Sequence, residues 1–149
     1  MSTGRLLGID HGIKRIGLAT CDASRLIATE LMVLHRKTRQ EDFDRINQIA
    51  AEQSVVGIVI GLPTDLDAPE GQHTQADTVK VWVERFSQTT KLPILLWDEQ
   101  MTSEDAKILS RQKKRHVRDP IDDLAARLIL QSYLDAWHDG LAPDLEGVE

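Results

Sequence analysis

The sequence predicts a single α/β domain built on a mixed, five-stranded sheet. Three apolar segments follow one another near the start of the chain, with only short polar connections between them. Two further strand-like segments then alternate with segments whose apolar residues recur at helical spacing. The first pattern is typical of an antiparallel meander, and the second of parallel strands joined by right-handed helical crossovers. With 149 residues, the chain has the length of one domain.

Five segments carry the apolar pattern of a buried strand. The first two, RLLGID and RIGLAT, are separated by HGIK, which is short enough for a hairpin turn. The third strand is expected over residues 26–34 and the fifth over residues 92–97. The fourth, VVGIVIGLP, is rich in β-branched residues and is closed by Gly61 and Pro63.

Four helices are expected, and two are recognised by their apolar stripes. These stripes consist of Phe43, Ile46, Ile49 and Ala50 in the first helix and of Ala76, Val79, Val83 and Phe86 in the second. A third helix is expected to start near Thr102, which Asp105 follows three residues later. The last helix is expected over about residues 120–138. Residues 1–140 would then form the domain, and residues 141–149 a flexible acidic tail.

Composition and charge limit the classes of function. The one cysteine, Cys21, excludes an intramolecular disulfide and fits a cytoplasmic location. No apolar run reaches transmembrane length, and no signal peptide is expected. The net charge of −6 argues weakly against a nucleic-acid partner. Residues 111–118, RQKKRHVR, nevertheless hold five basic side chains, which either form a solvated segment or contact phosphates: Arg111, Lys113, Lys114, Arg115 and Arg118.

Acidic residues are expected to gather at one edge of the sheet. Asp10 ends the first strand and Glu99 follows the fifth. Parallel α/β sheets bind ligands beyond the carboxyl ends of their strands, so the two carboxylates meet there if these strands are neighbours. Each acid also has a purely structural interpretation, because Asp10 could be a turn residue and Glu99 a solvated residue after an edge strand.

A third acid comes from the last helix. When the helix is projected at about 100° per residue, Asp122 falls within the apolar arc. That arc contains Ala125, Ala126, Ile129, Leu130, Tyr133, Leu134, Ala136 and Trp137. An acid on a core-facing stripe is costly unless something pairs with it. Alternatively, Asp122 lies in the first turn of a helix capped by Asp119, where the helix dipole favours acids.

Three close carboxylates favour a metal site. They repel one another and raise one another's pKa unless a cation lies among them. All-oxygen carboxylate sites suit Mg²⁺ or Mn²⁺. Two such ions can activate a water molecule and stabilise the leaving oxygen in phosphodiester cleavage, so the constellation indicates a metal-dependent nuclease.

Four motifs in succession resemble those of one known family. They are GIDHGIKRIGLATCD, GLPTDLDAPEG, DEQMTSEDA and IDDLAARLILQSYLD. Together they resemble the YqgF/RuvX-type family of pre-16S rRNA nucleases, also described as Holliday junction resolvase-like, in the ribonuclease H-like superfamily. The resemblance extends over about residues 6–135. It implies a ribonuclease H-like fold: three antiparallel meander strands, then two parallel strands, flanked by helices.

The resemblance also implies roles for individual residues. Carried over by position, the catalytic and metal-binding acids are Asp10, Glu99 and Asp122, with Mg²⁺ or Mn²⁺ as cofactor. Lys14 and Arg15 take the place of the family's basic pair and are expected to contact phosphates.

Other positions support or depart from the family pattern. Asp98 and Thr102 are expected to hold the metal-binding acids in place without binding the metal themselves. Gln100 stands where the family has an arginine, Asp65 where it has an asparagine, and Ala68 where it has a glycine. These changes bear on rate and substrate rather than on fold. His11 could act as a general base beside Asp10, but a turn residue is the simpler interpretation.

Three hypotheses for the function follow. The first is an endonuclease that processes the 5′ end of precursor 16S rRNA in ribosome biogenesis, or else a Holliday junction resolvase in DNA recombination and repair. The second is a non-catalytic nucleic-acid-binding assembly factor, favoured by Gln100 and Asp65. The third, an actin-like ATPase or sugar kinase, requires a second domain and a second phosphate loop. Expected partners are nucleic acid and ribosomal particles, with no membrane, and the protein is expected to be a monomer or weak homodimer.

Overall fold

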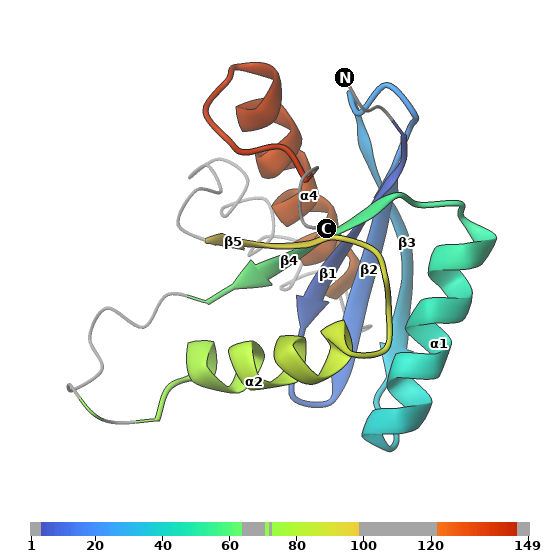
Figure 1. Cartoon of the computed structure of the whole chain (residues 1–149), viewed down its shortest axis with the longest axis vertical. Helices are drawn as coiled ribbons and strands as arrows, with labels where there is room; N and C mark the ends of the chain where they lie inside the picture. The colour runs from blue at the N-terminus through green and yellow to red at the C-terminus, as the bar shows by residue number, and fades with distance from the viewer. Residues whose placement is uncertain (1–3, 64–70, 72, 99–121, 146–149) are drawn as a thin grey trace, which may run out of the picture.

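We describe the protein from a computed structural model, in which residues 4–63, 71, 73–98 and 122–145 are described. The described part contains the strands and helices of a mixed α/β domain (Figure 1). In chain order these are β1 (Leu6–His11), β2 (Arg15–Cys21), β3 (Ala28–His35), α1 (Arg39–Glu52), β4 (Gly57–Leu62), α2 (Gln75–Ser87), β5 (Ile94–Asp98) and α4 (Asp122–His138).

The strands form one sheet in the order β3-β2-β1-β4-β5. The pairs β1–β2 and β2–β3 are antiparallel, whereas β1–β4 and β4–β5 are parallel. The predicted antiparallel meander followed by two parallel strands is therefore confirmed. In this order β4 lies between β1 and β5, which places β1 at the centre of the sheet.

The third strand starts later than residue 26 because the chain before it is held as a loop. One carboxylate oxygen of Asp22 accepts hydrogen bonds from the backbone N–H groups of Leu26 (2.9 Å) and Ile27 (3.1 Å). Arg25 adopts a left-handed backbone conformation with φ of 61°, which a strand does not allow. These contacts delay β3 until Ala28, and the strand continues to His35.

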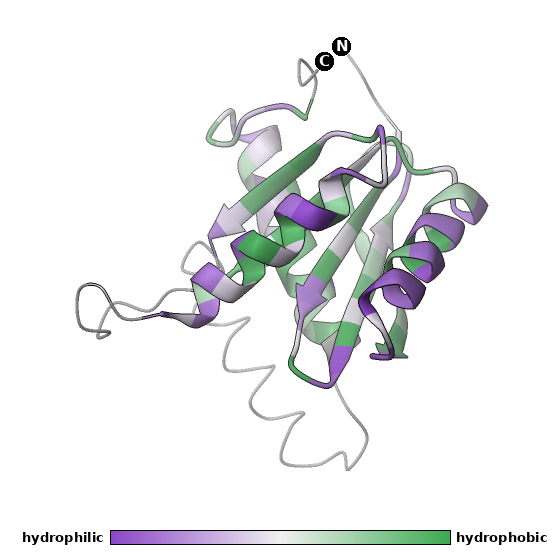
Figure 2. Cartoon of the chain, turned by 60° about the horizontal axis from the view of Figure 1, so that its bottom comes forward, coloured by the Kyte–Doolittle hydropathy of each residue, from purple (hydrophilic) through white to green (hydrophobic). Residues whose placement is uncertain are grey.

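Helices cover both faces of the sheet, α1 and α2 on one face and α4 on the other (Figure 1). The core on the first face is built on the predicted stripes, since Phe43, Ile46, Val79 and Phe86 are all buried in it. Hydrophobic residues are concentrated in the strands, and the outward side of α1 is hydrophilic (Figure 2). Both helices start at a threonine cap, and Thr74 forms a reciprocal capping box with Asp77 at the start of α2. None of the helices in the described ranges combines the length and apolar character needed to cross a membrane.

The ends of the described chain are tied together by Arg25, whose side chain is 1% exposed. Its Nε donates to the carbonyl oxygen of Gly4 (2.9 Å), and its guanidinium carbon lies 5.0 Å from the centre of the Trp137 ring. Its Nη1 lies 3.7 Å from a carboxylate oxygen of Asp144. Because Arg25 holds Asp144 and because Leu145 is buried, the chain packs on the domain beyond residue 140. Residues 141–145 thus differ from the flexible tail that was expected, because they pack on the domain. The rest of the expected tail lies outside the described residues.

Candidate active site at the carboxyl edge of the sheet

Asp10 lies near the carboxyl end of the central strand and faces α4. Successive side chains of a strand point to opposite faces of its sheet. Leu7 and Ile9 pack into the core beneath α1 and α2, whereas a side chain at Gly8 would meet α4. Asp10 is on the same face as Gly8, and it is half-buried. The predicted acid therefore sits on the most enclosed strand of the sheet, at the edge where ligand sites form.

Helix α4 runs antiparallel to β1, which brings its first residue to the same edge. Strand β3 runs in the direction of β1, because each is antiparallel to β2. The N–H of Ala28 donates to Gln131 Oε1 (2.7 Å), and further along β3 Glu30 lies 3.9 Å from Arg127. Helix numbering thus falls as strand numbering rises. The helix start at Asp122 accordingly lies toward the end of β1 that carries Asp10.

The approach of α4 to β1 is close because residue 8 is a glycine. A Cβ atom placed on Gly8 would lie 2.8 Å from Cβ of Leu130 and 3.1 Å from the carbonyl oxygen of Ala126. Both distances are shorter than ordinary van der Waals contacts. Gly8 therefore sets the distance between the strand that bears Asp10 and the helix that begins with Asp122.

The fifth strand is not a neighbour of β1, so the condition under which Asp10 and Glu99 would meet directly does not hold. Strand β4 intervenes, and strands in a sheet are spaced by about 4.8 Å, which separates β1 from β5 by about 10 Å. Trp97 packs against Tyr133 of α4, so Asp98 points to the opposite face. This orientation, away from the face of Asp10, argues against the supporting role expected for Asp98.

Several sequence predictions lie outside the described residues. They are Glu99, Thr102 and the helix expected after it, the basic residues Arg111, Lys113, Lys114, Arg115 and Arg118, and the departures Asp65, Ala68 and Gln100. For Asp122 only the backbone is described. Among the described side chains, no three of the types His, Cys, Asp and Glu gather as a metal site would require. The ligand set of Asp10, Glu99 and Asp122 thus remains a prediction.

The expected basic pair lies at the β1–β2 turn. Lys14 is exposed in the turn, and Arg15 is the half-buried first residue of β2. The turn is fastened by Arg36, whose N–H donates to the carbonyl oxygen of Lys14 (3.0 Å) and whose Nη1 donates to that of Gly12 (3.1 Å). The turn is therefore held firmly at the same end of the sheet as Asp10.

His11 is the residue that the sequence interpretation misplaced. It is the last residue of β1 rather than a turn residue, and it packs into the core with its ring centre 4.9 Å from that of Trp82. Neither ring nitrogen has a hydrogen-bond partner. Burial, and secondarily the charge of Arg36, lowers the pKa of His11 to about 4. The alternation of buried residues in β1 continues one residue past Asp10, and that continuation was the available signal.

The buried His11 should make the protein less stable in acid. The folded protein keeps His11 neutral down to about pH 4, whereas the unfolded chain takes up the proton near the ordinary pKa of 6.5. As the pH falls from 6.5 toward 4, the free energy of unfolding should therefore decrease, by at most about 1.4 kcal/mol per pH unit. Urea unfolding of wild type and His11→Phe at pH 7, 6 and 5 measures this effect. The variant should show the shallower pH dependence, and equal slopes would contradict the prediction.

Known proteins are similar in sequence to this chain over most of its length. A protein-family model described as RuvX, Holliday junction resolvase, matches residues 4–136. A protein of Thermoanaerobacter pseudethanolicus is 40% identical over 139 residues, covering 89% of this chain and 96% of that one. A protein of Syntrophus aciditrophicus is 42% identical over 135 residues, covering 89% of each chain. Both are named as pre-16S rRNA nucleases.

Solved structures share the fold at low sequence identity. RuvC of Thermus thermophilus, in complex with a Holliday junction substrate, superposes with a TM-score of 0.67 at 12% identity and covers 93% of this chain and 97% of its own. The yeast mitochondrial Holliday junction resolvase Ydc2 has a TM-score of 0.52 at 16% identity, covering 94% of this chain and 81% of its own. These neighbours confirm the ribonuclease H-like fold. With the family match over nearly its whole length, the chain belongs to the RuvX family of Holliday junction resolvase-like and pre-16S rRNA nuclease proteins.

Proposed function

We propose that this protein is a two-metal endonuclease that processes the 5′ end of precursor 16S rRNA in the cytoplasm. The observation that carries the proposal is the placement of Asp10 and of the α4 start at one end of the sheet, with Gly8 keeping strand and helix close. Asp10 belongs to the central strand and pairs with Gly17 of β2, which fixes the position of its backbone. Rigid placement of a carboxylate is what a hydrolytic site requires.

The residues fit a divalent cation by their chemistry. Asp10, Glu99 and Asp122 would supply carboxylate oxygens alone, the donors that Mg²⁺ and Mn²⁺ prefer. A bound metal would lower the pKa of a water molecule and stabilise negative charge on the phosphate. Asp10 is half-buried, so its charge is only partly screened by water.

Other residues of the chain would position the substrate. Lys14 is exposed on a turn that Arg36 fastens, and it would contact a phosphate beside Asp10. The start of α4 would add the positive end of a helix dipole, which favours phosphate and carboxylate groups nearby. Arg15 and the basic residues of segment 111–118 would hold further phosphates of the strand.

Precursor rRNA is favoured over branched DNA as the substrate. The relatives that are about 40% identical are named for pre-16S rRNA, whereas the two Holliday junction resolvases of known structure described above share the fold at 12% and 16% identity. A junction resolvase cuts two symmetric strands as a dimer. We propose a protein that acts on RNA as a monomer or weak homodimer, and junction resolution is the second candidate.

Parallel cleavage assays test the proposal. Purified protein is incubated with a labelled precursor 16S rRNA fragment or a labelled four-way DNA junction, in Mg²⁺, in Mn²⁺ and in EDTA. Metal-dependent cleavage of the RNA alone is the expected result. Cleavage of the junction alone would replace rRNA processing by junction resolution. Binding that persists in EDTA without cleavage in either metal would instead identify a non-catalytic assembly factor.

A further inference from the structure

A basic pocket lies on the sheet face opposite to Asp10. Its volume is about 240 Å³, and its polar lining consists of His11, Arg36, Arg39, His73, Thr78 and Arg85. Among the described residues that line it there is no Asp or Glu. The residues come from the end of β1, from the segments just before α1 and α2, and from these two helices, so distant parts of the chain concentrate positive charge at one place. We call this site the arginine pocket.

One wall of the arginine pocket is the imidazole ring of His11, which is buried and forms no hydrogen bond. His11 is 7% exposed, and both of its ring nitrogens lack hydrogen-bond partners. Leaving a buried polar group unpaired is costly, and native proteins rarely do so without a reason. The ring packs at a tilt of 56° against Trp82, which holds it in place at the pocket. A ligand oxygen would have to open this packing to reach a ring nitrogen, and it would pair with only one of the two.

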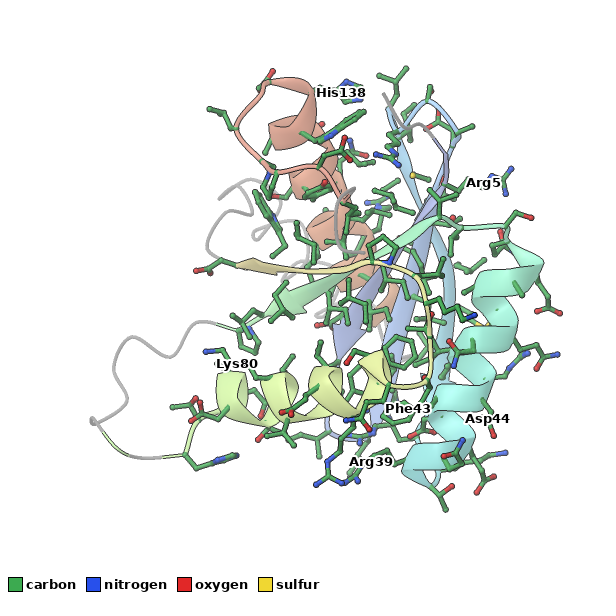
Figure 3. The ribbon with its side chains drawn as sticks, viewed as in Figure 1. Arg5, Arg39, Phe43, Asp44, Lys80 and His138 are labelled. Atoms are coloured by element: carbon green, nitrogen blue, oxygen red, sulfur yellow. The ribbon has the colours of Figure 1, made fainter. Side chains whose placement is uncertain are left out.

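The arginines of the pocket differ in how they are held. Arg36 is committed to the fold, because it donates to the β1–β2 turn and its Nε lies 3.7 Å from a carboxylate oxygen of Asp42. Arg39 and Arg85 are exposed, and neither pairs with an acid in the described part of the chain. Figure 3 shows Arg39 at the start of α1, near the turn and α2. The two side chains are thus available to an external anion.

The arginine pocket adjoins the proposed active site. His11 follows Asp10 directly in β1, and the two side chains lie on opposite faces of the same sheet edge. A nucleic-acid strand that crosses this edge would therefore meet Asp10 on one side and the pocket on the other. The exposed turn that carries Lys14 lies at the same end of the sheet.

We propose that the arginine pocket binds a backbone phosphate of the strand that is cleaved at Asp10, one or a few nucleotides from the cut. This inference rests on the proposed function. Guanidinium groups match phosphate oxygens in geometry and charge, and Arg39 and Arg85 supply them here. The phosphate would align the strand across the edge, so that Arg39 and Arg85 act as positioning residues and not as catalytic ones.

RNA binding in EDTA measures the pocket without cleavage. A labelled single-stranded fragment of the precursor is titrated with wild type, with Arg39→Gln/Arg85→Gln, and with Arg45→Gln/Lys91→Gln. The last variant removes two exposed charges outside the pocket. The pocket variant should bind about tenfold more weakly. Its slope of log affinity against log salt should be shallower by about 0.7, the loss of one phosphate contact. A slope equal to that of the control variant would overturn the proposal.

A second measurement distinguishes two possible ligands of the arginine pocket, a backbone phosphate of RNA and a small phosphate compound. Inorganic phosphate is titrated at constant pH while the ring C–H signal of His11, identified by its loss in His11→Phe, is followed by NMR. A saturable shift that disappears in Arg39→Gln/Arg85→Gln is expected. The shift could occur while Arg39→Gln/Arg85→Gln binds RNA as well as Arg45→Gln/Lys91→Gln does. The pocket would then bind a small phosphate compound, and the proposal of a strand phosphate would be wrong. If no shift occurs, the pocket is not a phosphate site.

The binding assay also keeps this inference distinct from the nuclease proposal. Asp10→Asn should retain the salt slope of wild type in EDTA, because the acid does not line the pocket. A protein that cleaves RNA but shows no effect of Arg39 and Arg85 on binding would refute the pocket alone. A protein that fails to cleave but loses binding in the pocket variant would refute the nuclease alone.

Discussion

Replacing Asp10 by asparagine should lower metal-dependent cleavage by about a thousandfold without unfolding the protein. Asparagine keeps the shape of the side chain but removes the charge that a divalent cation needs. Metal stabilisation of a phosphoryl transition state is worth several kcal/mol, and each 1.36 kcal/mol is tenfold in rate. Single-turnover cleavage of the labelled precursor in Mg²⁺ measures the loss.

Asp44→Asn is the matched control for this experiment. Asp44 is exposed on α1, as Figure 3 shows, and its carboxylate accepts a hydrogen bond from Gln40 (2.8 Å) within the same helix. That variant should cleave at the wild-type rate. The melting temperature of wild type should rise on addition of Mg²⁺, and that rise should shrink in Asp10→Asn. A folded Asp10→Asn protein with full metal-dependent cleavage would show that the carboxylate is dispensable.

Replacing Gly8 by alanine should weaken both the fold and the active site. The added methyl group would collide with Cβ of Leu130 and with the carbonyl oxygen of Ala126. Neither atom can move unless the α4 backbone moves with it. Overpacking of this kind costs about 1–3 kcal/mol. The displaced helix would carry Asp122 away from Asp10, and a misplacement of about 1 Å can cost about a hundredfold in rate. Urea unfolding and single-turnover cleavage measure the two effects.

Gly57→Ala separates the geometric effect from loss of stability. Gly57 lies in β4 beside Leu6, at the opposite end of the sheet from Asp10. An added Cβ would approach the flexible ends of Leu6 and Leu145, both at 3.2 Å. This variant should lose less stability and keep its cleavage rate under conditions where it is folded. Equal loss of activity in both variants would mean that the spacing set by Gly8 has no special role.

Much of the fold could be predicted because local patterns define the elements. The apolar stripe from Phe43 to Ala50 and the capping residues Thr38 and Thr74 lie within or next to the first two helices. Residues that are close in sequence therefore determine where these helices form. Strand order is different, because pairing joins segments that are distant in sequence. Alternation indicates which face of a strand is buried, but it does not indicate which strand lies beside it. The position of β4 between β1 and β5 was therefore not deducible.

The candidate site was predictable to a similar depth. Asp10 was predicted as a site residue because an apolar strand that ends in an acid needs a reason; the strand continues to His11, and the role of Asp10 stays a prediction. The arginine pocket was not foreseeable, since His11, Arg39 and Arg85 belong to three elements and no spacing links them. His11 itself was assigned to a turn because histidine carries no strong strand preference and stands next to a glycine.

The contacts of Arg25 determine the order in which parts of the domain can pack during synthesis. This residue is made early, yet its partners Trp137 and Asp144 are among the last parts of the domain to be synthesised. Helix α4, whose first residue lies toward the Asp10 end of β1, is also synthesised late in the domain. Before α4 is made, a growing chain can pair β1 with β2 and β4 but cannot cover the sheet face that carries Asp10. The proposed cleavage site therefore cannot form before α4 has been synthesised, and a chain that stops short of α4 lacks it.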